Sequence, residues 1–131
     1  MISTRGRYAL RVMIDIATHQ GEGYVPMKDV AARQELSLKY LEQILPALTK
    51  NRLVEGVQGK GGGYRLTRNP SDYKIGEILR VTEKDMAPVS CLAAGAEECG
   101  RRSECKTIKL WSGLNDVVNE YLDSHTLDEF L

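Results

Sequence analysis

The stretch that decides the fold spans residues 57–64 and reads Val57-Gln58-Gly59-Lys60-Gly61-Gly62-Gly63-Tyr64. Glycine tolerates positive φ and lets the backbone approach a ligand closely, so this run predicts a tight turn or a hairpin tip. The turn carries one positive charge, Lys60. It suits the tip of a DNA-contacting wing or a plain hairpin turn. A phosphate-binding loop is disfavoured, because Lys60 is followed by Gly61 rather than by Ser or Thr.

Two helical segments precede this turn. The first is predicted over residues 27–34 and the second over residues 38–51, with a three-residue break between them and Ser37 as the N-cap of the second. The second segment has an apolar stripe at helical spacing, formed by Leu41, Ile44, Leu45 and Leu48. A short helix, a break with a capping serine and a longer helix are typical of a helix-turn-helix.

Residues 53–57 and 63–67 predict two strands on either side of the turn. A helix-turn-helix followed by a basic-tipped hairpin is a winged helix, so we predict a mainly α fold with one small β-hairpin. The second helix would read base edges in the major groove, and the wing would contact the DNA backbone or the minor groove. The candidate DNA-binding residues are Ser37, Lys39, Tyr40, Glu42 and Gln43 on the second helix and Gly59, Lys60, Gly61 and Gly62 in the wing. Taken singly, each is equally an ordinary exposed residue.

A further helix is predicted from a cap at Ser3 or Thr4 to His19, with apolar residues at helical spacing between Tyr8 and Ala17. Arg5 and Arg7 place positive charge near its start, where a helix N-terminus can contact a phosphate group. These two arginines therefore join the candidate DNA-binding residues. A solvated helix face is the equal alternative.

Length and charge bound the remaining possibilities. The 131 residues suit one domain and carry no net charge. Residues 1–70 nevertheless hold eleven Lys and Arg against six Asp and Glu, whereas residues 71–131 hold seven against twelve. Such asymmetry favours a basic half that binds nucleic acid and an acidic half with another task. The chain shows no membrane-spanning apolar run, no signal-peptide pattern and no catalytic constellation, so we expect a cytoplasmic protein that is not an enzyme.

The three cysteines, Cys91, Cys99 and Cys105, fall within fifteen residues of one another. An odd number of cysteines in a cytosolic chain does not suggest a disulfide framework. Clustered thiolates are ligands for iron or zinc, so the cluster predicts a metal site, an iron–sulfur cluster or redox chemistry. Three ordinary thiols without a metal are the alternative.

A long amphipathic helix is predicted over residues 105–124. Its apolar residues repeat at a spacing of three and four, as Trp111, Leu114, Val118 and Tyr121. This is a large apolar surface for a lone peripheral helix, so we predict that it packs against the same helix of a second copy. Packing onto the chain's own core is the alternative. The predicted organisation is a DNA-binding domain over 1–82, a cysteine-bearing loop over 83–104, and a dimerisation helix with a tail over 105–131.

Taken together, these residues resemble the Rrf2 family of bacterial winged-helix regulators, and most closely its iron–sulfur cluster regulators. The resemblance covers nearly the whole chain, and its combination of motifs is specific. The matching pieces are Gly6-Arg7-Tyr8-Ala9, Ser37-Leu38-Lys39-Tyr40-Leu41-Glu42-Gln43, Gly59-Lys60-Gly61-Gly62-Gly63-Tyr64, the three-cysteine loop and Leu110-Trp111.

The resemblance implies a homodimer with crossed C-terminal helices and a [2Fe-2S] cluster held by Cys91, Cys99 and Cys105. It implies binding to double-stranded DNA that depends on the state of the cluster. By position, it gives DNA-reading roles to Ser37, Lys39, Tyr40 and Glu42, with Glu42 helping to discriminate between targets. The alternative is a repressor of the same type that a partner protein or a small metabolite controls, with cysteines that bind no cluster.

Two positions depart from the cluster-binding pattern. Gln58 stands where those regulators have an arginine before the wing, and Ile108 stands where they have a histidine ligand. Because an isoleucine cannot bind metal, the fourth ligand is left open. The candidates are Glu97, Glu98, Glu104, Thr107, a backbone group or a small thiol.

Overall fold

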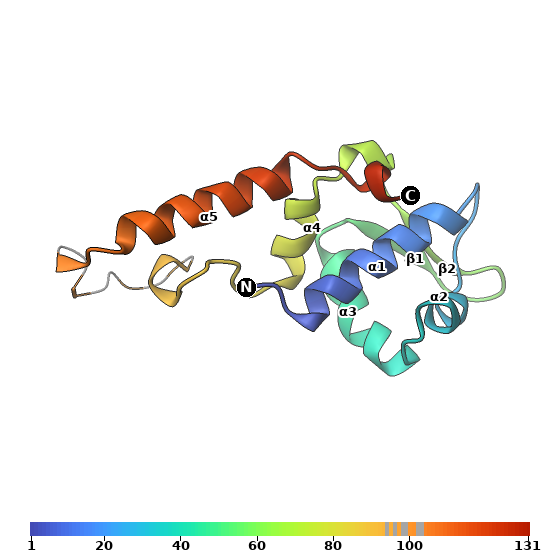
Figure 1. Ribbon diagram of the computed structural model, residues 1–131. Helices are drawn as coiled ribbons and strands as arrows, with labels where there is room; N and C mark the ends of the chain where they lie inside the picture. Colours follow the sequence, from blue (N-terminus) through green and yellow to red (C-terminus); the bar gives the residue numbers. More distant parts are fainter. Residues whose placement is uncertain (94, 96, 98–99, 102–103) are drawn as a thin grey trace.

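The computed structural model of the protein describes residues 1–93, 95, 97, 100–101 and 104–131 (Figure 1). Helices and one hairpin follow each other along the chain as α1 (Thr4–His19), α2 (Met27–Gln34), α3 (Leu38–Lys50), β1 (Val54–Val57), β2 (Gly63–Leu66), α4 (Ile75–Thr82) and α5 (Ile108–Asp123). Short 3-10 turns lie between or after them as η1 (Pro70–Asp72), η2 (Ser90–Leu92) and η4 (Leu127–Phe130). Elements α1 to α4 and the hairpin form one body, from which α5 extends to one side (Figure 1).

The core of this body lies between α1, α3 and α4. Each of these helices turns one apolar face inward, as the spacing of its apolar residues requires. The fully buried side chains include Val12, Met13, Ile16, Leu41, Ile44, Leu48 and Ile78. This packing buries the apolar face of α3 and leaves its polar residues exposed to solvent.

The two strands pair antiparallel, with Val54 opposite Leu66 and Val57 opposite Gly63. Val25 pairs with β2 in an isolated antiparallel bridge. Its backbone N–H donates to Tyr64 O at 2.8 Å, and its O accepts from Tyr64 N at 2.9 Å. Gly63 has a φ of +150°, and a Cβ there would overlap the backbone of Val25. A glycine is therefore required where the chain before α2 crosses the wing.

Tyr73 fastens the base of the wing to the core. Its ring is fully buried, and its hydroxyl donates to Leu53 O at 2.7 Å. The same hydroxyl accepts the backbone N–H groups of Thr67, at 2.9 Å, and Arg68, at 3.1 Å. A buried tyrosine needs such partners, and these three bonds fix the two ends of the hairpin relative to each other.

The C-terminal tail returns to the body formed by α1 to α4 and the hairpin. Leu127 is fully buried, and its N–H donates to Tyr73 O at 3.0 Å, while Ile75 N donates to His125 O at 3.0 Å. Thr126 caps η4 in a reciprocal box with Glu129. The tail thus ties the end of α5 to the region before α4.

The predicted fold class is confirmed, since the structure contains the helix-turn-helix and the hairpin wing in the expected order. The bounds of α2 and the start of α3 are as predicted. The first helix begins at Thr4 and ends at His19, as predicted from a cap at Ser3. The Ser3 hydroxyl caps it by accepting Gly6 N at 3.2 Å. The start of the last helix was predicted wrongly, because it begins at Ile108 rather than at residue 105. No helix within the described ranges combines the length and the apolar character needed to cross a membrane.

Candidate nucleic-acid interface and cysteine segment

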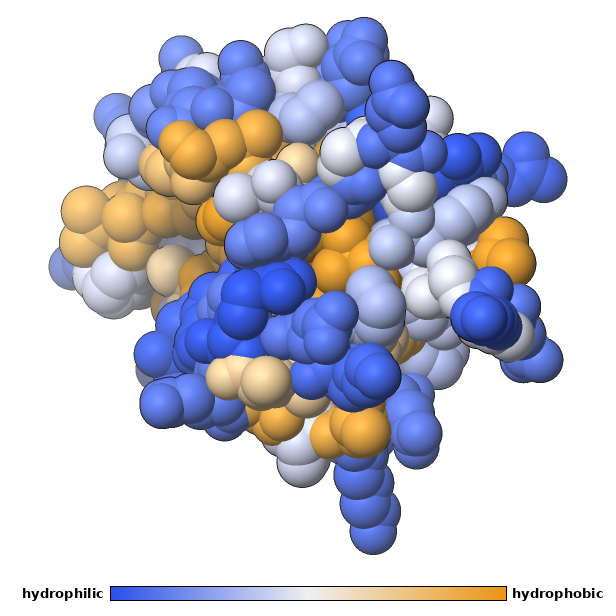
Figure 2. Space-filling model, turned by 90° about the vertical axis from the view of Figure 1, so that its right-hand side faces the viewer, coloured by the Kyte–Doolittle hydropathy of each residue, from blue (hydrophilic) through white to orange (hydrophobic). Residues whose placement is uncertain are grey.

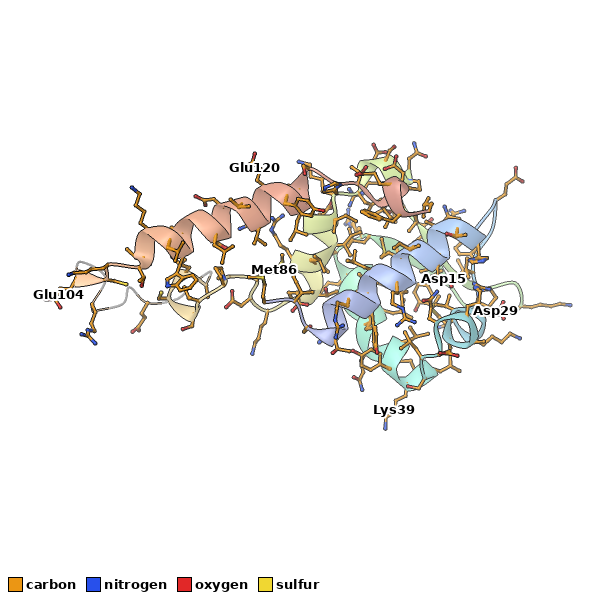
Figure 3. The ribbon with its side chains drawn as sticks, in the orientation of Figure 1. Asp15, Asp29, Lys39, Met86, Glu104 and Glu120 are labelled. Carbon is orange, nitrogen blue, oxygen red and sulfur yellow. The ribbon has the colours of Figure 1, made fainter. Side chains whose placement is uncertain are left out.

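The start of α3 presents polar side chains to solvent. Ser37 caps the helix by accepting Tyr40 N at 3.0 Å. Lys39, Glu42 and Gln43 are exposed, and Lys39 points away from the body of the molecule (Figure 3). The opposite side of the helix is buried in the core. This leaves a free helix face that carries hydrogen-bond donors and acceptors, as readout of base edges requires.

Two residues near the start of α3 are not exposed polar side chains. Tyr40 is half-buried, and its ring meets the Tyr8 ring edge to face with 5.6 Å between centroids. Leu38 is 48% exposed beside Lys39, although a leucine ordinarily avoids solvent. Leu38 is not part of the predicted apolar stripe of this helix, and it was not among the candidate DNA-binding residues. An exposed apolar side chain at this position can contact the methyl group of thymine.

Of the two arginines in the first turn of α1, Arg5 contacts the helix-turn-helix, whereas Arg7 bonds within α1. The Nη2 of Arg5 donates to Gln43 O on α3 at 2.9 Å. Arg7 is exposed and bonds locally, from its Nη2 to Thr4 Oγ1 at 3.1 Å. The structure therefore brings Arg5 and α3 together, which sequence spacing does not reveal.

The tip of the wing is exposed around Lys60. Gly59 and Gly61 have φ values of +93° and +75°, and Gly62 N donates to Gly59 O at 3.0 Å. These glycines close the turn with their backbone on the surface. The wing and α2 lie at the end of the body opposite α5 (Figure 1), and the face seen from that end is largely hydrophilic (Figure 2).

A buried carboxylate that the sequence prediction missed holds α1 to α2. The Asp15 side chain is 1% exposed and bonds the Arg33 guanidinium, with Nη2 to Oδ1 at 2.6 Å and Nε to Oδ2 at 3.0 Å. Gln34 Nε2 also donates to Asp15 Oδ2 at 2.8 Å. Burial alone raises the pKa of Asp15, but the hydrogen bonds from Arg33 and Gln34 outweigh it and hold this pKa below 3.8. An aspartate on the apolar face of a helix was the signal that could have found this site.

The cysteine segment, residues 83–105, contains two cysteines that the structure describes. Cys91, in η2, and Cys105, three residues before α5, are both half-buried. Cys99 and Glu98 lie outside the described residues. Within the described ranges no three His, Cys, Asp or Glu side chains are grouped so as to hold a metal ion.

Cys105 has a thiol suited to metal or redox chemistry. The Thr107 hydroxyl, 3.5 Å from Cys105 Sγ, lowers the pKa of this thiol. The backbone N–H groups of Thr107 and Ile108 and the charge of Arg101 act in the same direction. A lowered pKa raises the thiolate fraction, which is the form that binds metal and reacts. Glu97 and Glu104 are exposed nearby in sequence, and Ile108 is half-buried.

The long helix α5 keeps an apolar face in solvent. All sixteen of its residues are described, and none of them is buried. The exposed apolar residues follow one line along the helix: Leu110 at 62%, Leu114 at 38%, Val117 at 63% and Tyr121 at 63%. Of the predicted stripe, Leu114 and Tyr121 lie on this line, whereas Trp111 and Val118 are half-buried on an adjacent face.

Comparisons with known proteins agree with this architecture. A family model described as Rrf2, an iron-dependent transcriptional regulator, matches residues 2–131. The HTH-type transcriptional regulator IscR of Pectobacterium atrosepticum is 38% identical over 130 residues, which cover 99% of this chain and 78% of that protein. Among solved structures, IscR of T. potens has a TM-score of 0.77 and 38% identity, covering 98% of this chain and 83% of that one.

A second kind of regulator is equally similar. The structure of CymR, the global cysteine regulator of B. subtilis, has a TM-score of 0.81 and 38% identity, covering 98% of this chain and 93% of that chain. The fold of this chain is therefore similar to the folds of both IscR and CymR. The protein described here belongs to the Rrf2 family of transcriptional regulators.

Proposed function

We propose that the protein is a homodimeric, sequence-specific DNA-binding regulator that senses iron–sulfur cluster or redox status through a [2Fe-2S] cluster. It would act on double-stranded DNA in the cytoplasm. The observation that carries the sensing role is the grouping of Cys91, Cys99 and Cys105 within fifteen residues, directly before the long helix α5. The family model's description as an iron-dependent regulator and the likeness to IscR support the same proposal.

The donor chemistry of the cysteine segment fits an iron–sulfur cluster in part. Cys91, Cys99 and Cys105 would supply thiolate ligands, and the bound cluster would supply one-electron redox chemistry and sensitivity to iron supply. The fourth ligand is open among Glu97, Glu98, Glu104, Thr107, a backbone group and a small thiol. Thr107 already lies beside Cys105 and favours its thiolate form.

On DNA, the start of α3 would read bases while the wing and α1 contact the phosphate backbone. Ser37, Lys39, Tyr40, Glu42 and Gln43 form the reading face, with Leu38 as an apolar addition. Gly59, Lys60, Gly61 and Gly62 form the wing contact, and Arg5 and Arg7 add positive charge at the start of α1, where Arg5 contacts α3. Two such surfaces in a dimer would span half-sites separated by one helical turn or more.

The two kinds of DNA contact predict different mutant behaviour. Lys60→Ala should weaken binding to all duplexes alike and reduce the slope of log affinity against log salt by about 0.9, the share of one phosphate contact. Glu42→Ala should change which sequences bind best. Lys109→Ala, which removes the same charge from α5, is the control for Lys60. Fluorescence anisotropy across a salt series measures these effects, and an equal, sequence-independent loss from both variants would contradict this division of roles.

The cluster proposal is tested by anaerobic reconstitution with iron and sulfide. We expect visible charge-transfer absorption with about two irons and two sulfides per subunit. Cys91→Ala, Cys99→Ala and Cys105→Ala should each bleach it, while Ser90→Ala, beside Cys91, should keep it. A colourless wild-type protein after reconstitution would rule out the cluster.

A second candidate is a regulator controlled by a small metabolite or a partner protein, with cysteines that bind no cluster. The likeness to CymR favours it, as does a cavity of about 320 Å³ between α4, the cysteine segment and α5. Arg80, Met86 and Asn119 are among the residues that line this cavity. This candidate predicts that DNA binding survives the loss of all three thiols and responds to an added effector.

A further inference from the structure

Glu83 joins the beginning of the cysteine segment to the first turn of α1. It is the C-cap of α4, directly after Thr82 and eight positions before Cys91. Its Oε1 accepts two hydrogen bonds from Ser3, one from the backbone N and one from Oγ, both at 2.8 Å. Since Ser3 is the N-cap of α1, the carboxylate lies at the positive end of that helix dipole. The N-terminus and the segment after α4 are side by side in Figure 1.

Gly6 leaves the room that the Glu83 carboxylate occupies. Gly6 is buried in the first turn of α1, and a Cβ there would overlap Glu83 Oε1 and lie 2.9 Å from Glu83 Cδ. Glycine is otherwise unfavourable inside a helix, so its presence here is explained by the carboxylate above it. An alanine at position 6 would displace the Glu83 side chain without disturbing the helix itself.

The same turn of α1 contacts the recognition helix. Arg5 lies between Ser3 and Gly6, and its guanidinium donates to Gln43 O on α3. The route from the cysteine segment to α3 therefore has two steps, from Glu83 to the capped turn and from Arg5 to Gln43. Arg7, the other arginine of this turn, is part of the proposed DNA-binding surface.

A matching contact joins α4 to α5. Arg80, one turn before Glu83, donates to Asp123 Oδ1 at 2.7 Å, to Asp123 Oδ2 at 3.0 Å and to Asn119 Oδ1 at 2.9 Å. A Cβ at Gly76 would overlap Asp123 Oδ1, so a second glycine makes room for this carboxylate. Helix α4 is thus bonded to α5 through Arg80 and to α1 through Glu83, and both side chains line the 320 Å³ cavity.

We propose that Glu83 is a positioning residue for DNA binding: its carboxylate holds the first turn of α1 against the recognition helix and links that turn to the cysteine segment. Rearrangement of the segment would reach the DNA-binding surface by loosening or tightening this contact. The positioning role stands without a cluster, and the link to the segment rests on the proposed sensing function.

The test compares Glu83→Ala and Gly6→Ala with Asp85→Ala in the cluster-free protein. Asp85 is an exposed carboxylate two residues further on, so its loss removes the same charge. We expect Glu83→Ala and Gly6→Ala to lower DNA affinity about tenfold, the size expected for charge-assisted hydrogen bonds. Removing a negative charge by itself should raise DNA affinity slightly, and Asp85→Ala should show only this effect. The loss of affinity expected for Glu83→Ala is therefore opposite in sign to the effect of charge alone. Glu83→Gln, which keeps an acceptor oxygen, should recover part of the loss.

Amide hydrogen exchange provides a readout that does not depend on DNA. The amides of the first turn of α1 should exchange faster in Glu83→Ala and Gly6→Ala than in Asp85→Ala or the wild type. Unchanged exchange together with a DNA affinity within twofold of wild type would overturn the positioning role. A wild-type response to the cluster that persists in full in Glu83→Ala would overturn the link to the segment. If the DNA affinity of the wild type does not change with the cluster while Glu83→Ala still binds DNA more weakly, the sensing proposal is contradicted and the positioning role of Glu83 stands.

Discussion

The double substitution Leu114→Asp and Val117→Asp is expected to turn a dimeric protein into a monomer and to weaken binding to a two-half-site DNA by about 100-fold or more. Both side chains lie on the exposed apolar line of α5, and none of the sixteen residues of this helix is buried within its own chain. Two carboxylates on this line would have to be buried without partners in a helix–helix interface. Loss of the dimer removes the second recognition helix, and with it the avidity for paired half-sites.

Light scattering coupled to size exclusion measures the mass, and anisotropy measures the DNA affinity. Glu120→Ala is the matched control on the same helix, because Glu120 points away from the rest of the molecule (Figure 3). This control should remain dimeric. A double variant that keeps the dimer mass would place the interface elsewhere, and a wild-type monomer at micromolar concentration would contradict dimerisation through α5.

Replacing Asp15 by Asn is expected to lower the free energy of unfolding by about 2–3 kcal/mol and the melting temperature by roughly 10 °C. The Asp15 carboxylate is buried and receives bonds from both Arg33 and Gln34, so its neutral amide loses the charge-assisted part of these bonds. The pair holds α2 against α1, so DNA affinity should fall as well. Differential scanning calorimetry at one fixed protein concentration measures the change, because the proposed dimerisation would make the melting temperature concentration-dependent.

Asp29→Asn is the control, since Asp29 is an acidic residue in the first turn of α2 with no side-chain bond to the network described above. It should cost less than about 1 kcal/mol. A double-mutant cycle of Asp15→Asn with Arg33→Ala isolates the pair, and a coupling energy near zero would show that the contact does not stabilise the fold.

The stability that Asp15 contributes should depend on pH in a defined direction. The folded pKa of Asp15 is lower than its ordinary value of 3.8, so the folded state favours the charged form. This contribution is fully present above pH 3.8 and is lost as the pH falls through the folded pKa below it. The stability difference between wild type and Asp15→Asn should therefore be constant near neutral pH and shrink under strongly acidic conditions.

Local patterns in the sequence were sufficient to predict the winged-helix fold. Apolar spacing with a break before Ser37 defined α2 and α3, and the glycine run defined the hairpin. The same rules misplaced the start of α5, because the apolar face of that helix begins at Ile108 and no local signal distinguishes residues 105–107. The apolar stripe of the long helix predicted a dimer, and the three clustered cysteines predicted a metal site, an iron–sulfur cluster or redox chemistry. The family resemblance narrowed the second prediction to a [2Fe-2S] cluster. The cluster and the dimer both remain predictions.

Contacts between distant residues could not be predicted in this way. The bond from Glu83 to Ser3 spans eighty residues, and the bond from Arg5 to Gln43 spans thirty-eight. The pairing of Val25 with Tyr64 and the docking of Leu127 beside Tyr73 are also long-range. Such contacts depend on how whole helices pack, and hydrophobic periodicity carries no information about which polar groups then meet.

The central claim is that the cysteine segment controls DNA binding, and DNA affinity in two states of the protein tests it most directly. Binding sites are first selected from random duplexes with each state. The affinity of the anaerobically reconstituted protein is then compared with that of the cluster-free protein and of a variant with Cys91, Cys99 and Cys105 all changed to Ala. We predict that reconstitution changes wild-type affinity for at least one selected site by about tenfold or more, a coupling of about 1.4 kcal/mol, and leaves the triple variant unchanged. Equal wild-type affinities in both states at every selected site, or the same response from the triple variant, would contradict the claim.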